Sequence, residues 1–275
     1  MKFTDTIITH HQIGPDGALV SNPVPESPYL ETAVVHPCVV QIRFNRSQAR
    51  NAISGLMVDE VERVFDVAES NGSEVRAIIL SGDSKAFCAG AELESLRSAK
   101  RQADSGDLQS ARALLERVYQ VFLRPLRSTI PTIACIDGAA VGAGLNIALG
   151  ADVRIASVGA YFESRFLKIG LHPGGGHTWL LDRAIGSANA KRMALFNQRI
   201  DAAEATRIGL VQQLTSDPVE CERAAIELAR PLLDANRDLM LAIKGSLGIA
   251  SRSTHEDTLR HETDVQVNGL SRLTL

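Results

Sequence analysis

The order of apolar and polar residues predicts that the first half of the chain alternates between strands and helices. Residues 38–44 are rich in β-branched side chains that partly alternate with polar ones, which is typical of a strand. Ser54 is a good N-cap for a helix reaching about Ser70, because apolar residues recur there at helical spacing. The apolar run 75–80 predicts a strand buried on both faces, and the three elements together indicate a parallel βαβ unit.

Small residues follow the next two predicted strands. The strand that begins at Ala86 leads into the turn 88–91, and the strand that begins at Ile133 leads into the turn 139–144. Between them, the polar residues 97–107 are expected to form a mobile loop, followed by a long amphipathic helix from Leu108 that Pro125 should break. Because active sites of α/β folds lie at the carboxyl ends of strands, these two turns are the first candidate site.

Helical spacing dominates the chain after residue 176. Helices are predicted over residues 177–186, 190–196, 202–208, 220–233 and 239–250, whereas the tail 252–275 is too polar to assign. Residues 1–35 contain many glycines and prolines and are expected to be an extension, loose or folded over the surface. The sequence therefore predicts an α/β protein with an N-terminal extension (1–35), a core (36–200) and a C-terminal helical region (201–275).

Composition and charge fit one large soluble domain. The chain has 275 residues, of which 45% are hydrophobic and 22% charged, and its net charge of −3 gives no general attraction to nucleic acid or anionic membranes. No apolar run approaches the roughly 20 residues that span a bilayer, and the first residues lack the apolar core of a signal peptide. The four separated cysteines are expected to be free thiols in a reducing cytoplasm, and His10-His11 without further ligands does not predict a metal site.

The two small-residue turns suggest a pocket that stabilises negative charge. Backbone N–H groups can approach a ligand closely where glycine and alanine replace larger side chains, and Ala91 and Ala143 lie where this is possible. Two such N–H groups can hold one carbonyl oxygen as it becomes negative. The alternative is that the small residues only permit tight packing of strands against helices, and composition alone leaves both interpretations open.

Several motifs, in order and with sensible spacing over residues 37–250, resemble the enoyl-CoA hydratase/isomerase (crotonase) superfamily. Asn45-Arg46 with Ala49-Arg50-Asn51-Ala52 is similar to its CoA-side motif, residues 86–93 to its first oxyanion-hole loop, and residues 137–152 to its second. Residues 169–186 resemble the stretch after the catalytic loop, and residues 200–211 resemble the segment that leads to the C-terminal helices.

This resemblance implies a crotonase-like spiral of ββα units whose C-terminal helices assemble a homotrimer or homohexamer. It implies an acyl-CoA thioester as the ligand, with coenzyme A as part of the substrate and no separate cofactor. The N–H groups of Ala91 and Ala143 would bind the thioester carbonyl oxygen, and Arg50 could hold CoA phosphates as a fixed planar cation. The other substrate-binding positions that it implies are Ala52, Ala89, Gly90, Glu92, Leu93, Gly142, Asn146, Arg165 and Phe166.

The sequence departs from the family at the two acid–base positions. The hydratases use two glutamates to add water to an enoyl thioester, and in this chain those positions are Asn146 and Phe166, which cannot transfer protons. His172 is the replacement candidate nearest to the pocket loops, and Glu163 is a second. His177 is expected to be structural. Three hypotheses follow: an unusual hydratase or isomerase, a non-catalytic acyl-CoA-binding protein, or another reaction such as decarboxylation or thioester hydrolysis.

Overall fold

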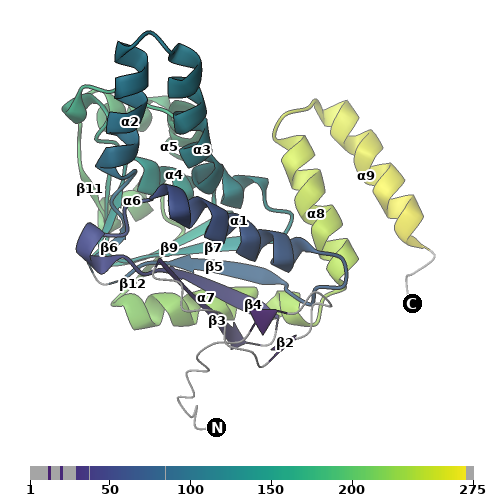
Figure 1. Ribbon diagram of the computed structural model, residues 1–275. Helices are drawn as coiled ribbons and strands as arrows, with labels where there is room; N and C mark the ends of the chain where they lie inside the picture. Colours follow the sequence, from purple (N-terminus) through teal and green to yellow (C-terminus); the bar gives the residue numbers. More distant parts are fainter. Residues whose placement is uncertain (1–11, 14–18, 21–28, 37, 84, 271–275) are drawn as a thin grey trace.

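The computed structural model describes residues 12–13, 19–20, 29–36, 38–83 and 85–270, which form sheets covered by helices (Figure 1). The largest sheet has the strand order β12-β9-β7-β5-β4-β3, and every neighbouring pair is parallel except β3 with β4. Its strands are β3 (Leu30–His36), β4 (Val39–Phe44), β5 (Ala77–Ser81), β7 (Thr132–Ile136), β9 (Val153–Ser157) and β12 (Gln213–Thr215). Apart from it, β1 (Gln12–Ile13) pairs with β2 (Leu19–Val20).

A smaller sheet lies beside the first and has the order β11-β10-β8-β6. Its strands are β6 (Ala86–Cys88), β8 (Ala139–Val141), β10 (Tyr161–Glu163) and β11 (Ile200–Asp201). The chain crosses from the large sheet to the small one three times, from β5 to β6, from β7 to β8 and from β9 to β10, and each crossing is followed by helix. These repeats confirm the predicted spiral of ββα units.

The helices cover both faces of the large sheet. They are α1 (Gly55–Glu69), α2 (Leu93–Asp104), α3 (Leu108–Arg127), α4 (Ala143–Gly150), α5 (His177–Ala194), α6 (Ala202–Arg207), α7 (Pro218–Leu233), α8 (Arg237–Ala250) and α9 (His255–Leu270). Figure 1 shows α7 below the large sheet and α1 above it. Short 3-10 turns, η1 (Ser47–Ala49) and η2 (Leu167–Ile169), precede α1 and α5.

The apolar runs of the central strands are explained by burial on both faces. In β5, Ile78 and Leu80 belong to the main core beneath α1, whereas Ala77 and Ile79 pack toward α7 through Cys221 and its neighbours. Successive side chains of a strand point to opposite faces, so a strand covered on both sides needs apolar residues at every position. The predicted N-cap of α1 is confirmed, because the Ser54 side chain accepts a hydrogen bond from the Met57 N–H.

The structure corrects two predictions in the middle of the chain. Residues 97–107 are not a mobile loop, because α2 runs to Asp104 and packs against α3 with Ala99 buried. Ion pairs on the helix surface, such as Lys100 with Asp104 one turn later, support this polar helix. Pro125 does not break α3, which continues to Arg127, because only the last turn loses a backbone hydrogen bond there.

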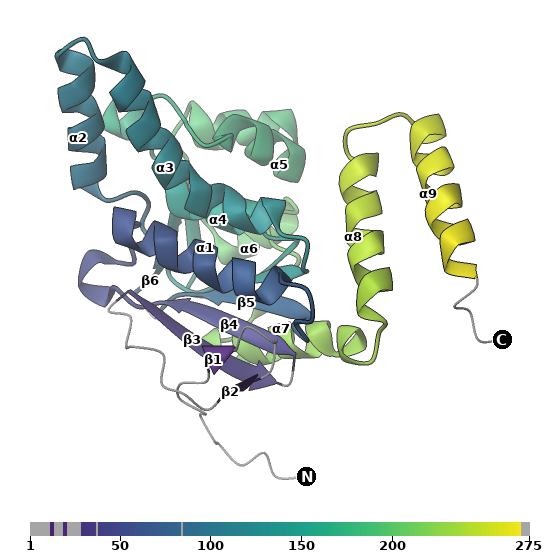
Figure 2. The ribbon, with the colours of Figure 1, turned by 45° about the vertical axis from the view of Figure 1, so that its right-hand side comes forward.

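Both ends of the chain also differ from expectation. Leu30–His36 forms an edge strand of the large sheet, so the sheet begins within the segment that was assigned to the extension. The tail that the sequence left unassigned contains α9, whose first turn is capped by Thr254. In Figures 1 and 2, α8 and α9 stand as a pair to one side of the sheets, and none of the α9 residues is buried.

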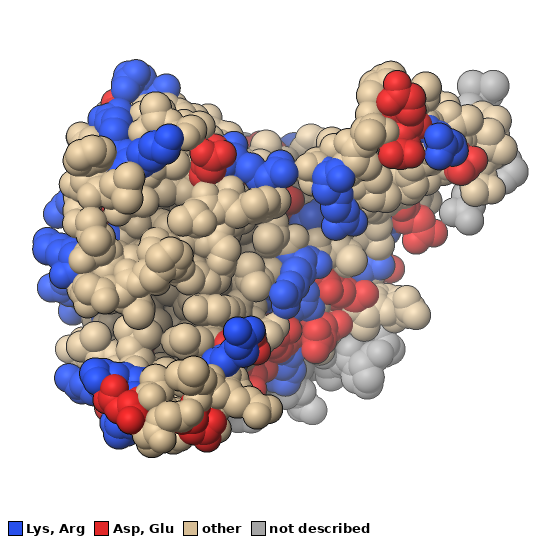
Figure 3. Space-filling view, turned by 90° about the horizontal axis from the view of Figure 1, so that it is seen from above, with Lys and Arg blue, Asp and Glu red and all other residues tan. Residues whose placement is uncertain are grey.

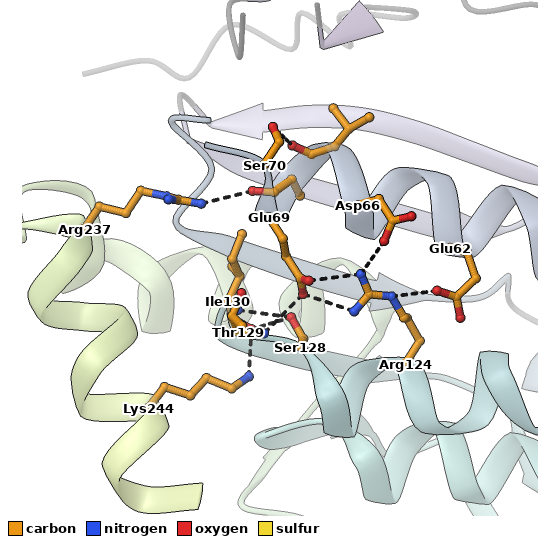
Figure 4. A network of polar contacts seen from close by, with 12 residues as sticks. Glu62, Asp66, Glu69, Ser70, Arg124, Ser128, Thr129, Ile130, Arg237 and Lys244 are labelled. Atoms are coloured by element: carbon orange, nitrogen blue, oxygen red, sulfur yellow. Dashed lines mark hydrogen bonds and ion pairs between the residues drawn. The ribbon is translucent and has the colours of Figure 1, made fainter. Parts of the chain in front are cut away.

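An ion-pair network joins α1 to α3 (Figure 4). The Arg124 side chain, 9% exposed, contacts the carboxylates of Glu62 at 3.0 Å, Asp66 at 2.9 Å and Glu69 at 3.0 Å. Nearby, the Lys244 ammonium of α8 donates to the Ile130 carbonyl oxygen at 2.7 Å, which ties α8 to the core. The network holds α3 in place, and α3 in turn carries one wall of the cavity described below.

Replacing Arg124 by methionine is expected to destabilise the fold by about 2–3 kcal/mol. Removing the cation leaves the partly buried carboxylates of Glu62 and Glu69 without their partner, while the exposure of Asp66 moderates the cost. Urea unfolding at a fixed protein concentration measures the change. Arg117→Met is the matched control, because Arg117 pairs with Asp59 between the same two helices at the surface and should change stability by less than about 0.5 kcal/mol. Equal effects of both substitutions would contradict a buried role for Arg124.

Candidate active site

The two turns singled out from the sequence lie side by side at the ends of parallel strands. Strands β6 and β8 are paired with Cys88 opposite Ala140, so the loops that follow them leave the sheet at the same edge. A Cβ atom built on Gly144 would lie 2.0 Å from the Cys88 carbonyl oxygen, so only glycine allows α4 to begin this close to β6. This close packing brings the two loops together.

The N–H groups of Ala91 and Ala143 are unpaired in the described part of the chain. The first loop is held by hydrogen bonds on either side of Ala91, since Ile53 donates to the Gly90 carbonyl oxygen at 2.8 Å and Glu92 donates to that of Ile53 at 2.9 Å. Ala143 is the first residue of α4, where an N–H has no partner within the helix. A Cβ built on Gly90 would be 3.7 Å from the Ala143 nitrogen, so the loops are in contact.

A cavity of about 910 Å³ opens beside these two N–H groups. Most of the residues predicted to bind the ligand lie on its wall, together with both alanines: Ala52, Ala89, Gly90, Ala91, Glu92, Leu93, Gly142, Ala143, Arg165, Phe166 and His172. Helix α3 forms a further wall that the sequence does not predict, and it contributes Leu115, Val118, Tyr119 and Phe122. The apolar face of that amphipathic helix was visible in the sequence, but nothing local indicated that part of it faces a cavity.

Two predicted ligand-binding residues do not lie on the cavity wall. Arg50 has a left-handed backbone conformation with φ +50°, and its carbonyl oxygen accepts from the Ala89 N–H at 3.0 Å. Its backbone therefore supports the first loop, while its side chain is exposed outside the cavity. Asn146 is completely buried behind the wall. Glu92 lines the cavity, and its carboxylate pairs with Arg46 at 3.0 Å.

Asn146 belongs to a buried chain of hydrogen bonds that the sequence did not reveal. Its Nδ2 donates to the Gly174 carbonyl oxygen at 2.9 Å, and its Oδ1 lies 2.6 Å from Nδ1 of His177. Nε2 of His177 lies 2.8 Å from Oγ of Ser164. Burial lowers the pKa of His177 to about 4, so its imidazole is neutral at pH 7. Ser164 also lines the cavity.

Phe166, at the second predicted acid–base position, and His172, one of its two possible replacements, both line the cavity, whereas Glu163 does not. Phe166 packs against the His177 ring with the centroids 4.9 Å apart, so an aromatic side chain lies at the position where the resemblance implies a carboxylate. Glu163 is buried, pairs with Arg165 at 3.4 Å and is not among the cavity-lining residues. His172 is exposed on the cavity wall, and its Nδ1 donates to the Pro173 carbonyl oxygen at 2.8 Å, which leaves Nε2 to accept a proton.

The charged groups on the cavity wall are few. Arg165 and Lys168 contribute its cationic side chains, which are 43% and 62% exposed. Viewed from above, the left part of the molecule presents a largely uncharged surface bordered by lysine and arginine, whereas basic and acidic side chains are mixed toward the right (Figure 3). Within the described residues, no His, Cys, Asp and Glu side chains form a cluster that could hold a metal ion, and His10 and His11 lie outside those residues. None of the described helices is long and apolar enough to cross a membrane.

Comparison with known sequences agrees with this geometry. The family model described as enoyl-CoA hydratase/isomerase matches residues 35–273. A Mycobacterium tuberculosis protein named "Probable enoyl-CoA hydratase" is 42% identical over 224 residues, which cover 82% of this chain and 83% of the relative. The 1,2-epoxyphenylacetyl-CoA isomerase of Escherichia coli is 31% identical over 229 residues, covering 83% of this chain and 85% of that enzyme.

Solved structures show the same fold. An enoyl-CoA hydratase from Bacillus anthracis superposes with a TM-score of 0.79 and 26% identity, over 90% of this chain and 92% of that one. A Thermobifida fusca protein described as an enoyl-CoA hydratase in complex with acetoacetyl-CoA gives a TM-score of 0.78 and 26% identity, covering 89% of this chain and 95% of that one. Sequence, fold and cavity agree, and the chain belongs to the enoyl-CoA hydratase/isomerase family.

Proposed function

We propose that this protein binds an acyl-CoA thioester in the cavity and polarises its carbonyl group with the N–H groups of Ala91 and Ala143. The observation that carries the proposal is the pair of unpaired N–H groups on adjacent loops at the cavity wall. Donors fixed in advance at such a position stabilise the negative charge that develops on a thioester oxygen, either in an enolate or in a tetrahedral intermediate. The Thermobifida fusca relative bound to acetoacetyl-CoA supports the ligand class.

The rest of the cavity suits the two ends of such a ligand. The apolar residues of α3, among them Leu115 and Val118, offer a surface for the acyl chain. Arg165 and Lys168 line the cavity and offer cations for the phosphates of CoA. Arg50 could contact those phosphates only from outside the cavity wall. Neither Asn146 nor Phe166 can transfer a proton, so the proposed chemistry rests on the polarised carbonyl rather than on a pair of glutamates.

Calorimetric titration with butyryl-CoA tests the proposal. We expect saturable binding that Leu115→Trp weakens at least tenfold, because the indole would occupy part of the cavity. Leu114→Trp is the matched control, since Leu114 is the adjacent residue on α3, is 36% exposed and does not line the cavity. No binding to the wild-type protein, or equal binding by both variants, would contradict the proposed site.

Replacing Arg165 by glutamine is expected to weaken acyl-CoA binding about three- to tenfold at low salt, with a smaller effect at high salt. The guanidinium is partly exposed, so its attraction to phosphate is screened by salt. Titrations of both proteins at two ionic strengths measure the effect. Arg223→Gln on α7 is the control, because it removes an exposed arginine that does not line the cavity. An Arg165 effect independent of salt would argue against a phosphate contact.

His172 is the candidate for proton transfer in this cavity, because its imidazole lines the wall and can accept a proton at Nε2. If it serves the reaction, His172→Ala should lower turnover without weakening acyl-CoA binding. Turnover that is unchanged in this variant would exclude the role.

We also propose assembly into a homotrimer or homohexamer through α8 and α9. The two helices expose a set of large apolar side chains that includes Leu239, Ile243, Leu247, Leu259 and Val267, each more than half exposed in the single chain. Exposed apolar surface of this extent is typical of a protein interface. Sedimentation equilibrium measures the mass, and a monomer at micromolar concentration would contradict the assembly.

A further inference from the structure

Three buried polar side chains from different parts of the fold form a chain of hydrogen bonds, which we call the relay. Ser164 follows strand β10, His177 is the first residue of α5, and Asn146 lies in α4. Their exposed fractions are 0%, 1% and 0%, and the hydrogen bonds between them measure 2.8 Å and 2.6 Å. The spacing of a hydroxyl, an imidazole and an orienting amide is the arrangement that activates a serine nucleophile in unrelated hydrolases.

The direction of each hydrogen bond follows from one carbonyl group. The Gly174 carbonyl oxygen can only accept, so the group of Asn146 that faces it at 2.9 Å must be the amide NH₂. Oδ1 of Asn146 therefore faces His177 and accepts a proton from Nδ1–H. In the neutral imidazole Nε2 then has no proton, and it accepts the hydrogen bond of the Ser164 hydroxyl. An amide in the opposite orientation would select the wrong tautomer, which Gly174 prevents.

Ser164 is the member of the relay that lines the cavity, while His177 and Asn146 lie behind it. Strands β10 and β8 are parallel with Glu163 opposite Val141, so the next residues, Ser164 and Gly142, leave the sheet together. The Gly142 N–H donates to the Glu163 carbonyl oxygen at 2.9 Å. This pairing places Ser164 beside the loop of Ala143, whose N–H faces the proposed thioester carbonyl.

We propose that Ser164 is a nucleophile that attacks the thioester carbonyl held by Ala91 and Ala143, so that the protein hydrolyses acyl-CoA through an acyl-serine. The inference rests on the proposed acyl-CoA binding and adds a reaction to it. His177 acts as the base, and Asn146 is a positioning residue. The low pKa of His177, about 4, agrees with a base that is unprotonated at neutral pH.

The steps balance with water as the second substrate. Oγ of Ser164 bonds to the carbonyl carbon while its proton passes to Nε2 of His177. The C–S bond then breaks, and the CoA sulfur leaves with that proton, which gives free CoA thiol and the acyl-serine. A water molecule gives its proton to His177 and attacks the ester, and the serine oxygen recovers the proton as the carboxylic acid leaves.

The test combines hydrolysis with covalent labelling of the full-length protein. Release of CoA from butyryl-CoA and octanoyl-CoA is measured, and the protein is treated with an alkyl fluorophosphonate, which loses fluoride when a nucleophilic serine attacks its phosphorus. We expect phosphonylation at Ser164, and CoA release lowered about 10³-fold by Ser164→Ala and by His177→Gln. Because Ser164 is fully buried in the single chain, labelling also tests whether Oγ can be reached from the cavity. Ser81→Ala is the matched control, since it removes a buried hydroxyl that bonds to Gln41 away from the cavity.

The pH profile separates a base from a structural histidine. Asn146→Asp places a carboxylate beside His177 and should move the acidic limb of CoA release upward by about one to two pH units, because the charge favours imidazolium. An unchanged limb, absent labelling of Ser164, or labelling that persists in His177→Gln would overturn the proposal. Calorimetry on the same samples distinguishes two negative results. Binding of butyryl-CoA without hydrolysis would contradict only the serine mechanism, whereas absence of binding would contradict the proposed function as well.

Discussion

Ala143→Pro is expected to abolish the polarisation of a bound thioester and to lower any thioester turnover about 10²–10³-fold. Ala143 is the first residue of α4, a position where proline fits the helix because the N–H it removes has no helical partner. The substitution therefore deletes one proposed donor from the cavity wall while α4 can still form. The pyrrolidine ring would also occupy the space between this loop and Gly90, where the carbonyl oxygen is proposed to bind.

Infrared difference spectroscopy of a thioester labelled with ¹³C at its carbonyl measures polarisation without requiring turnover. The wild-type protein should shift the carbonyl stretch of bound butyryl-CoA to lower wavenumber, and Ala143→Pro should lose most of that shift. Ala202→Pro is the matched control, because Ala202 is the first residue of α6 and does not line the cavity. A shift that is retained in Ala143→Pro would show that the carbonyl does not bind at this N–H.

Hydration of crotonyl-CoA by the wild-type protein is expected to be at least about 10⁴-fold slower than by a family member that has both glutamates. Each positioned acid or base typically contributes about 10²–10⁴-fold to the rate, and the family resemblance assigns the two positions to an amide, Asn146, and a phenyl ring, Phe166. The structure strengthens this expectation, since Asn146 is enclosed by its bonds to Gly174 and His177, and Glu163 does not reach the cavity wall.

Loss of the absorbance of the conjugated thioester measures hydration, with a two-glutamate hydratase assayed in parallel. Calorimetry on the same sample must show that crotonyl-CoA binds, so that slow hydration is not confused with an empty site. Hydration at a rate comparable to the reference enzyme would contradict the prediction and would require another acid–base pair in the cavity. His172 would then be the first residue to replace.

Local sequence signals predicted most regular elements because their causes are local. The N-cap at Ser54 and the apolar face behind it placed α1 within a residue or two of its ends. Residues 97–107 are different, because their polar composition predicts a loop whereas α2 forms there through its tertiary contact with α3. Pro125 likewise does not end α3, because a proline near a helix end disturbs only the final turn. The polar tail was left unassigned, and it forms α9.

The candidate site was accessible from the sequence only in part. Ala91 and Ala143 could be singled out because glycine and alanine beside strand ends leave the backbone open, and their ordered motifs matched one family. Arg50 was expected to contact the ligand, yet its side chain lies off the cavity wall because the left-handed turn directs its carbonyl group to the first loop. The α3 wall could not be foreseen, since an amphipathic face does not reveal whether it meets a core or a cavity.

By itself, the sequence predicted the alternation of strands and helices, the two small-residue turns, and Asn146 and Phe166 at the positions where the family resemblance implies glutamates. These depend on residue type and short-range spacing. Only the tertiary structure showed that Asn146, Ser164 and His177 lie together, because they come from three elements and share no motif. Hydrogen bonds act over about 3 Å, and only the folded sheets bring those side chains within that distance. The sequence predicts only a structural role for His177. In the structure, His177 lies between Asn146 and Ser164 and contacts both.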